Sequence, residues 1–241
     1  MIRILIVAAT QPEIEPLFNG KSNGAAVVSS ELKQEHQLFS TQSSLLKTHH
    51  SKQQTTLLVT GVGMVATAYA LGLHLAATRY DLVINLGVAG SFDRSLALGE
   101  VVEITNDTFS ELGAEDDARF LPIDHLGFGK SSFNAGTSLA ALRDQFNISH
   151  PGFSLKHVTG VTVNTVHGNE HTIHQITSRL NPQVESMEGA AFFYACHQAG
   201  VPGLQIRAVS NYVEKRNRDN WQIGLAIKNL NTFAAELLNA L

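Results

Sequence analysis

Cysteine is almost absent from this sequence, which contains a single one in 241 residues. That residue, Cys196, lies inside an apolar run. The chain therefore cannot form an internal disulfide or build a zinc site from cysteine thiolates. A protein that does without disulfides suits a reducing compartment, so we expect a cytoplasmic location.

Charge is also scarce, and neither sign dominates. Only 16% of the residues are charged, and 17 Lys and Arg residues stand against 21 Asp and Glu residues, giving a net charge of −4. Such a chain lacks the basic field that holds a nucleic-acid backbone, so we expect no nucleic-acid partner. Hydrophobic residues make up 44% of the chain, which excludes extensive disorder and is typical of a packed globule.

Long hydrophobic runs are missing too. No window of about 20 apolar residues is free of charge, so we expect no membrane span. The apolar stretch at residues 2–9 is short, contains Arg3 and is followed at once by polar residues. This pattern favours a buried β-strand over a secretory segment.

The remaining apolar segments alternate between strand-like and helix-like patterns. Branched apolar runs predict strands at residues 2–8, 55–60, 82–87, 100–105, 155–163 and 204–209. Helices are predicted at residues 64–78, 136–146, 170–179, 189–199 and from 220 to the C-terminus. The alternation predicts a three-layer α/β/α sandwich with a central mixed β-sheet, as a single domain over residues 1–241. Region 24–54 predicts half-solvated antiparallel strands, and region 106–133 a long loop.

A glycine-containing turn, Gly61-Val62-Gly63, joins a predicted strand to a predicted helix. This is the local form of a dinucleotide fingerprint, whose glycines let phosphate oxygens approach a helix N-terminus. The fingerprint also needs an acidic residue at the carboxyl end of the next strand, whereas Asp81 precedes that strand. We therefore expect a tight turn and no nicotinamide or flavin cofactor.

Three histidines with helical spacing, His167, His171 and His174, lie around Glu170. The order of glutamate and histidine is not that of a zincin, and the stretch is otherwise polar. We expect a solvated helix face here rather than a metal centre.

Three other polar side chains fit together better. Glu13 follows the first predicted strand, Glu188 stands at the start of a predicted helix, and Arg207 lies in a buried strand that ends in polar groups. Ligands of α/β proteins bind beyond the carboxyl ends of strands, which places these residues to line one pocket with segment 87–90. Taken singly, each has an ordinary explanation: a dipole-stabilised carboxylate for Glu188, a surface charge for Glu13 and a salt bridge for Arg207.

As an ordered set, these motifs resemble the nucleoside phosphorylase superfamily. The set comprises Glu13, Thr60-Gly61-Val62-Gly63, Asn85-Leu86-Gly87-Val88-Ala89-Gly90, Glu185-Ser186-Met187-Glu188 and Arg207-Ala208-Val209-Ser210-Asn211. Nearly the whole chain is similar to the methylthioadenosine/S-adenosylhomocysteine nucleosidases of that superfamily, with region 24–54 matching least. Segment 210–221 resembles in particular that of the futalosine hydrolases, enzymes of the alternative menaquinone pathway.

The resemblance implies three catalytic residues. Glu13 is the general base that takes a proton from water, assisted by Arg207. Asn211 contacts N7 of the purine, where adenine-specific nucleosidases carry an aspartate. An asparagine can accept a hydrogen bond from protonated N7 and donate one to O6, so it favours hypoxanthine over adenine as the leaving base.

The resemblance also implies the residues that bind the substrate, namely Val88, Ala89, Gly90, Val163, Asn164, Met187, Glu188, Ser210, Arg216 and Arg218. Met187 and Glu188 face the ribose, whose 2′ and 3′ hydroxyls donate hydrogen bonds to the Glu188 carboxylate, and segment 163–164 flanks the base. Arg216 and Arg218 are expected to grip a carboxylate on the 5′ substituent. At position 88 the nucleosidases commonly have a serine, whose hydroxyl contact has no counterpart in valine.

Hydrolysis and phosphorolysis differ in the need for a phosphate site. The phosphorylase branch uses an Arg and a Ser where this chain has Asn85 and Val88, neither of which is cationic. We therefore expect water to cleave futalosine into hypoxanthine and dehypoxanthinyl futalosine, without metal or organic cofactor. Superfamily members are commonly homodimers or larger homo-oligomers, and we expect the same here.

Two other functions stay open at this point. One is a methylthioadenosine/S-adenosylhomocysteine nucleosidase, and the other is a nucleoside-binding regulator without turnover. The presence of both Glu13 and Glu188 argues against the regulator, because binding alone does not need a base that activates water.

Overall fold

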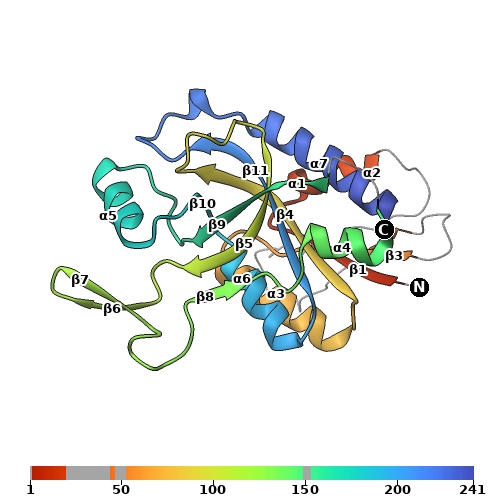
Figure 1. Ribbon diagram of the computed structural model, residues 1–241, viewed down its shortest axis with the longest axis horizontal. Coiled ribbons are helices and arrows are strands. Elements are labelled where there is room, and N and C mark those ends of the chain that lie inside the picture. Colours follow the sequence, from red (N-terminus) through yellow and green to blue (C-terminus); the bar gives the residue numbers. More distant parts are fainter. Residues whose placement is uncertain (1, 20–43, 47–52, 149–152) are drawn as a thin grey trace, which may run out of the picture.

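A β-sheet forms the centre of the protein, of which the computed structural model describes residues 2–19, 44–46, 53–148 and 153–241 (Figure 1). Its strands are β1 (Ile2–Ala8), β2 (Ser44–Leu46), β3 (Gln53–Val59), β4 (Leu82–Ser91), β5 (Val101–Phe109), β8 (Ser132–Asn134), β9 (Lys156–Thr162), β10 (Val184–Ser186) and β11 (Gly203–Tyr212). Over the described residues their order is β10-β9-β5-β11-β4-β1-β3-β2, and β8 pairs with β5. Strand β11 is parallel to β4 and antiparallel to β5, so the sheet is mixed.

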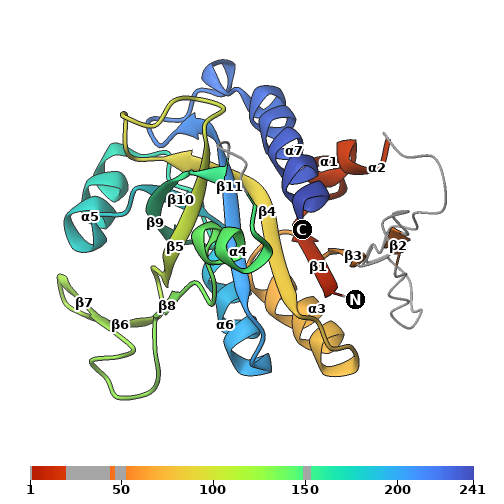
Figure 2. The ribbon, with the colours of Figure 1, turned by 45° about the vertical axis from the view of Figure 1, so that its right-hand side comes forward.

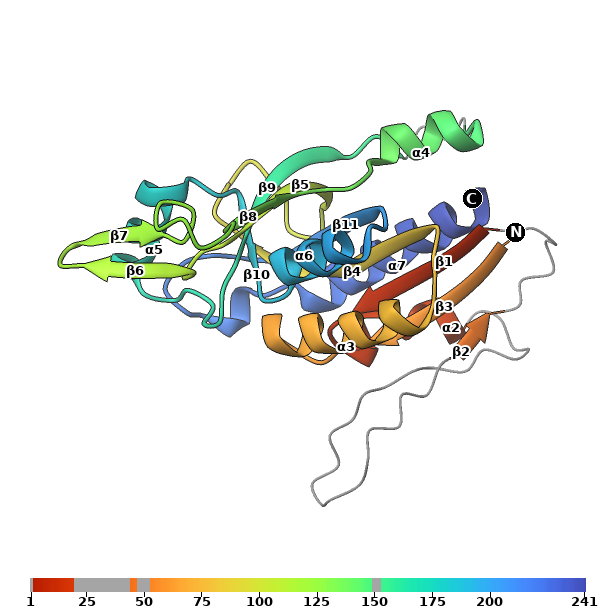
Figure 3. The ribbon, with the colours of Figure 1, turned by 90° about the horizontal axis from the view of Figure 1, so that it is seen from below.

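Helices cover both faces of this sheet. Helices α3 (Met64–Ala77) and α6 (Gly189–Ala199) lie side by side on one face (Figure 3). Helix α7 (Ile223–Ala240) covers the other face, next to the short helices α1 (Gln11–Ile14) and α2 (Pro16–Asn19) (Figure 2). Helix α4 (Leu139–Phe146) contributes to the same core as α7, and α5 (Glu170–Leu180) lies near β9 and β10. The predicted three-layer α/β/α sandwich is confirmed.

Strand β1 shows why both faces must be covered. Ile4 and Ile6 belong to the core on the α7 side, whereas Leu5 and Val7 belong to the core that includes residues of α3 and α6. All four side chains are buried. Successive side chains of a strand point to opposite faces, so an unbroken apolar run requires a layer on each side.

The carboxyl ends of β1, β4 and β11 meet at one edge of the sheet, because β4 is parallel to both neighbours. The register between β11 and β4 shifts between Val209 and Asn211, which places Asn211 opposite Gly90. Strand β10 pairs antiparallel with the end of β4 and places Glu185 opposite the same glycine. Gly90 therefore has polar residues on both sides.

Region 106–133 differs from the prediction. It was expected to be a loop, but β5 continues to Phe109, and a two-stranded hairpin of β6 (Gly113–Asp116) and β7 (Arg119–Pro122) follows before β8. The hairpin projects away from the sheet in Figure 1, and its side chains are exposed or half-buried. Alternation of apolar and polar residues arises when one face of a strand is buried. These strands have no buried face, so their sequence lacks the alternation and resembles that of a loop.

Smaller differences concern element ends. Helix α7 begins at Ile223 rather than at residue 220, because residues 218–220 form a 3-10 turn capped by the Asn217 side chain. Helix α4 begins at Leu139, where Ser138 caps its first turn.

Of region 24–54, β2 pairs antiparallel with β3 as expected, while residues 24–43 and 47–52 lie outside the described residues. Within the described ranges, no helix is long and apolar enough to cross a membrane.

Candidate active site

A cavity of about 450 Å³ opens at the edge of the sheet where β1, β4 and β11 end. Most of the residues proposed from the sequence line it, namely Glu13, Val88, Ala89, Gly90, Met187, Glu188, Ser210, Asn211 and Arg216. They come from segments far apart in the chain, and the sheet order brings them together. The structure therefore brings these nine positions together at the strand ends, where α/β proteins bind ligands.

Three hydrogen bonds hold the Glu13 carboxylate in the first turn of α1. The backbone nitrogen and the hydroxyl of Thr10 donate to its Oε2 at 2.8 and 2.9 Å, and the backbone nitrogen of Val88 donates to Oε1 at 3.3 Å. Burial raises the pKa of the Glu13 carboxyl above its ordinary value, and the nearby Arg207 guanidinium opposes that rise. A raised pKa makes the carboxylate a better proton acceptor than an exposed glutamate.

Arg207 lies behind the cavity wall rather than in its lining. It is 1% exposed, and its Nη1 lies 3.8 Å from Oε2 of Glu188. On the neighbouring strand it stands opposite Gly87, and a Cβ at that glycine would collide with Nη1. The same Cβ position is 3.1 Å from Oε1 of Glu13. The guanidinium therefore lies beside both carboxylates, in space that only a glycine at position 87 leaves open.

A buried network orients this arginine. Nε of Arg207 donates to Oε1 of Gln205 at 3.0 Å, and Nε2 of Gln205 donates to Asp107 at 3.2 Å. Asp107 also accepts from the Thr162 hydroxyl at 2.8 Å, and burial raises its pKa to about 6. The sequence prediction missed Asp107 because it assigned the residue to a loop; an acidic residue inside a strand would have been the signal.

Glu188 is fixed by the turn before α3. The backbone nitrogen of Gly63 donates to its Oε1 at 3.0 Å, and Gly63 has a φ of +96°, which favours glycine. The turn that looks like a dinucleotide fingerprint thus serves to hold a carboxylate of the protein itself. Met187 and Glu188 both face the cavity.

The opposite end of the cavity is formed around Gly90. A Cβ at Gly90 would lie 3.2 Å from Nδ2 of Asn211 and 3.5 Å from Cγ of Glu185. The Asn211 amide donates to the carbonyl oxygen of Tyr212 at 3.1 Å, and its Oδ1 accepts from the Ser210 hydroxyl at 2.8 Å. These contacts fix the amide plane and leave one N–H and one lone pair of the amide for other partners.

His167 differs from its prediction as part of a solvated helix face. It precedes α5, is half-buried, and lines the cavity. Its ring Nδ1 lies 2.6 Å from Oε2 of Glu185, a carboxylate that is 3% exposed. The sequence prediction left both residues without a role; a second glutamate three residues before Glu188 was the available signal.

Besides Arg207, three proposed site residues lie outside the cavity lining. Val163 is fully buried and continues the β-ladder by donating to the carbonyl oxygen of Ser186. Asn164 is exposed and donates to Glu111. Arg218 lies outside the lining. Val163 extends β9 into the core and Asn164 turns outward, so neither residue lines the cavity.

Arg216 does reach the cavity. Its guanidinium lies over the indole of Trp221, 4.9 Å from the ring centroid, and both residues line the cavity. Its backbone nitrogen donates to Gly168, which fastens this segment to the loop before α5.

Among the described residues, no group of three or more His, Cys, Asp or Glu side chains is arranged to hold a metal ion. Asn85 is 1% exposed and does not line the cavity.

The fold and this arrangement of carboxylates identify a class of protein. The chain belongs to the phosphorylase superfamily, whose family model matches residues 3–241. It is similar to the futalosine hydrolase of Streptomyces coelicolor, with 32% identity covering 75% of this chain and 77% of the relative. The futalosine hydrolase of Acidothermus cellulolyticus is 34% identical, covering 74% and 73%.

A more distant relative is the 5′-methylthioadenosine/S-adenosylhomocysteine nucleosidase of Psychromonas ingrahamii, with 28% identity covering 78% of this chain and 82% of the relative. Among solved structures, the native futalosine hydrolase of Helicobacter pylori matches with a TM-score of 0.77 and 18% identity, covering 100% of this chain and 98% of that one. This structural match shows the shared fold.

Proposed function

We propose that the protein is a futalosine hydrolase, an N-glycosyl hydrolase that uses water to release hypoxanthine from futalosine. The observation that carries the proposal is that Glu13 and Glu188 line one cavity and both lie beside the Arg207 guanidinium. The similarity to futalosine hydrolases at 29–34% identity supports the choice of substrate. The product then serves the alternative menaquinone pathway.

The chemistry divides between the two carboxylates. Cleavage of the bond between the anomeric carbon and the purine leaves positive charge on the sugar and the electron pair on the departing base. Glu188 accepts hydrogen bonds from the ribose diol and places negative charge near the developing cation. Glu13 takes a proton from the water whose oxygen attacks the anomeric carbon, a contribution of typically 10²–10⁴-fold. The Arg207 guanidinium lies beside both carboxylates and opposes the rise in the pKa of Glu13.

Water is the nucleophile in this proposal. Phosphate would need a cationic or hydrogen-bonding site near the anomeric carbon, and neither Asn85 nor Val88 supplies one at the cavity wall. Of the residues that the structure describes, Arg216 is the one arginine or lysine in the cavity lining, and its guanidinium lies over the ring of Trp221. We assign Arg216 to binding the carboxylate of the 5′ substituent, because a guanidinium can donate two parallel hydrogen bonds to a carboxylate.

The test is a chromatographic assay of the full chain with futalosine, inosine and methylthioadenosine, each with and without phosphate. Free hypoxanthine from futalosine, at a rate that phosphate does not change, is the expected result. A preference for methylthioadenosine would make the protein a nucleosidase of that type, and a sugar 1-phosphate product would make it a phosphorylase. Binding without turnover of any substrate would support a regulator.

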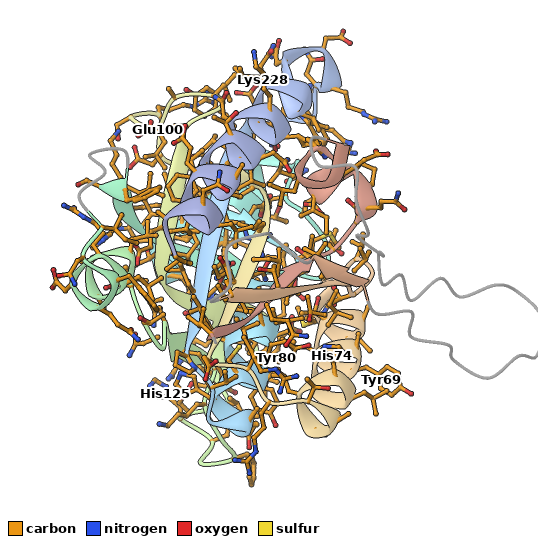
Figure 4. The ribbon with its side chains drawn as sticks, turned by 90° about the vertical axis from the view of Figure 1, so that its right-hand side faces the viewer. Tyr69, His74, Tyr80, Glu100, His125 and Lys228 are labelled. Atoms are coloured by element: carbon orange, nitrogen blue, oxygen red, sulfur yellow. The ribbon has the colours of Figure 1, made fainter. Side chains whose placement is uncertain are left out.

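We also propose that the protein forms a homodimer. An apolar stripe runs along α3, with Val65 77% and Tyr69 51% exposed, and Figure 4 shows Tyr69 pointing outward. Together with Phe128 and Tyr194 these residues line a hollow of about 920 Å³. This surface begins at Met64, next to the glycine that binds Glu188, so a second copy would adjoin the active site.

A buried, unpaired Cys196 fits the proposed cytoplasmic location.

Light scattering after size exclusion tests the dimer. Val65→Glu is expected to shift the native dimer towards monomer, while Ala235→Glu, on the exposed side of α7, leaves it unchanged. A native protein that is monomeric at micromolar concentration would contradict the proposal.

A further inference from the structure

Glu185 and His167 form a hydrogen-bonded pair in the cavity lining, next to Gly90. The Glu185 carboxylate accepts the backbone N–H of His167 on Oε1 at 3.0 Å and contacts the ring Nδ1 through Oε2 at 2.6 Å. Phe92 packs edge-on against the same imidazole, with ring centroids 6.1 Å apart. The ring is therefore fixed both in position and in orientation.

This hydrogen-bond pattern assigns the tautomer of the imidazole. An ionised carboxylate only accepts hydrogen bonds, so the proton of a neutral imidazole must lie on Nδ1. Nε2 then carries a lone pair, and it makes no hydrogen bond with any described residue. Because His167 lines the cavity and its Nδ1 edge is turned to Glu185, the Nε2 edge is the polar edge left for a ligand.

Two glycines of β4 show where along the cavity this pair lies. Gly87 adjoins Glu13 and Arg207, which mark the end where the glycosidic bond is broken. Gly90 adjoins Asn211 and Glu185. Three residues of extended strand separate the two positions by about 10 Å. A purine whose sugar is held near Glu13 therefore directs its six-membered ring towards Glu185 and His167.

We propose that Nε2 of His167 accepts a hydrogen bond from N1–H of the purine, so that His167 is a specificity-determining residue and Glu185 its positioning residue. A 6-oxopurine carries a hydrogen on N1, whereas a 6-aminopurine has a lone pair there, which would face the lone pair of Nε2. This contact is separate from that of Asn211 with N7 and O6. The inference rests on the proposed function, because it names the class of purine that the hydrolase accepts.

Kinetics test the contact through the ratio of kcat/KM for futalosine to that for its 6-amino counterpart. His167→Ala is expected to lower this ratio by roughly tenfold to a hundredfold. The variant no longer accepts a hydrogen bond from N1–H of futalosine, and it no longer opposes the N1 lone pair of the 6-amino substrate. Glu185→Gln should also lower it, because a carboxamide can donate to Nδ1 and so move the ring proton to Nε2. His171→Ala, an exposed histidine on α5, serves as the matched control and should leave the ratio unchanged.

A nitrogen-15 NMR spectrum of the histidine rings provides a second readout that does not depend on turnover. With the signals assigned through His167→Gln, the native protein should show a protonated Nδ1 and an unprotonated Nε2 on His167, and added hypoxanthine should shift Nε2. A protonated Nε2, an Nε2 signal that bound hypoxanthine leaves in place, or an unchanged substrate ratio in His167→Ala would each overturn the inference. Absence of futalosine cleavage by the native protein would instead reject the proposed function.

Discussion

Nη1 of Arg207 lies 3.8 Å from Oε2 of Glu188, with the two side chains 1% and 8% exposed. Bringing two charges out of water costs several kcal/mol per ion, and that cost is offset only when the partners stay together. Removing either partner leaves an uncompensated charge behind the cavity. The position of this pair depends on Gly87, whose missing side chain provides the space for the guanidinium.

Gly87→Ala should therefore displace Arg207 and lower kcat by at least tenfold, because a one-ångström misplacement of a catalytic group can cost about 10² in rate. Gly72→Ala in α3 is the control, since a Cβ there meets nothing within 4 Å. Turnover and thermal melting of both variants check the prediction. A Gly87→Ala enzyme as active as the native one would show that the guanidinium need not stay where it is.

Glu13→Gln should fold and bind nucleoside but lose at least two orders of magnitude in turnover, the lower bound of general-base catalysis. Because burial raises the pKa of Glu13, the acid limb of the native kcat/KM profile should lie above the ordinary glutamate value of 4.5. The active form is the ionised one, so activity falls as the pH drops through that pKa. The measurement is the pH profile of both proteins; a variant that keeps both the rate and the limb would remove Glu13 from the mechanism.

Asp107 should make the folded protein less stable as the pH rises. Its pKa in the folded state is about 6 against 3.8 in an exposed chain, so folding favours the protonated form. The corresponding stability is complete below pH 3.8 and is lost as the pH rises through about 6. Urea unfolding of the native protein and of Asp107→Asn should show the variant gaining relative to the native protein between these values. A difference that is constant with pH would contradict the assignment.

Arg216→Ala should weaken futalosine more than inosine, which lacks the carboxylate, with the loss appearing mainly in KM. Arg218→Ala is the matched control, because Arg218 lies outside the cavity lining although it also stacks near Trp221. Steady-state kinetics with both substrates decide the matter. Equal losses on the two substrates, or a larger effect of Arg218, would count against carboxylate recognition by Arg216.

Asn211→Asp should move the substrate ratio towards the 6-amino counterpart of futalosine by about one order of magnitude. The amide of Asn211 can donate to O6, whereas an ionised aspartate faces O6 with like partial charge. The ratio of kcat/KM values for the two substrates is the measurement. An unchanged ratio with both activities intact would mean that Asn211 only supports the end of β11.

Much of this protein could be predicted from local pattern. The apolar run of β1 requires cover on both faces, and the helix predicted at residues 189–199 matches α6 at both ends. Glu13, Glu188 and Asn211 were expected to share a pocket because strands of an α/β sheet place their carboxyl ends at one edge. These inferences need only periodicity over a few residues and a general rule about where such sheets bind ligands.

Other features depend on contacts that no local pattern contains. The bond from Gly63 to Glu188 joins positions 125 residues apart, and His167 meets Glu185 because β10 doubles back on the end of β4. Asn164 likewise donates to Glu111, 53 residues away along the chain. Sequence alone determined the layers and the edge at which the site lies. Tertiary structure decided which polar groups meet there, because strand order and register set the neighbours of each buried charge.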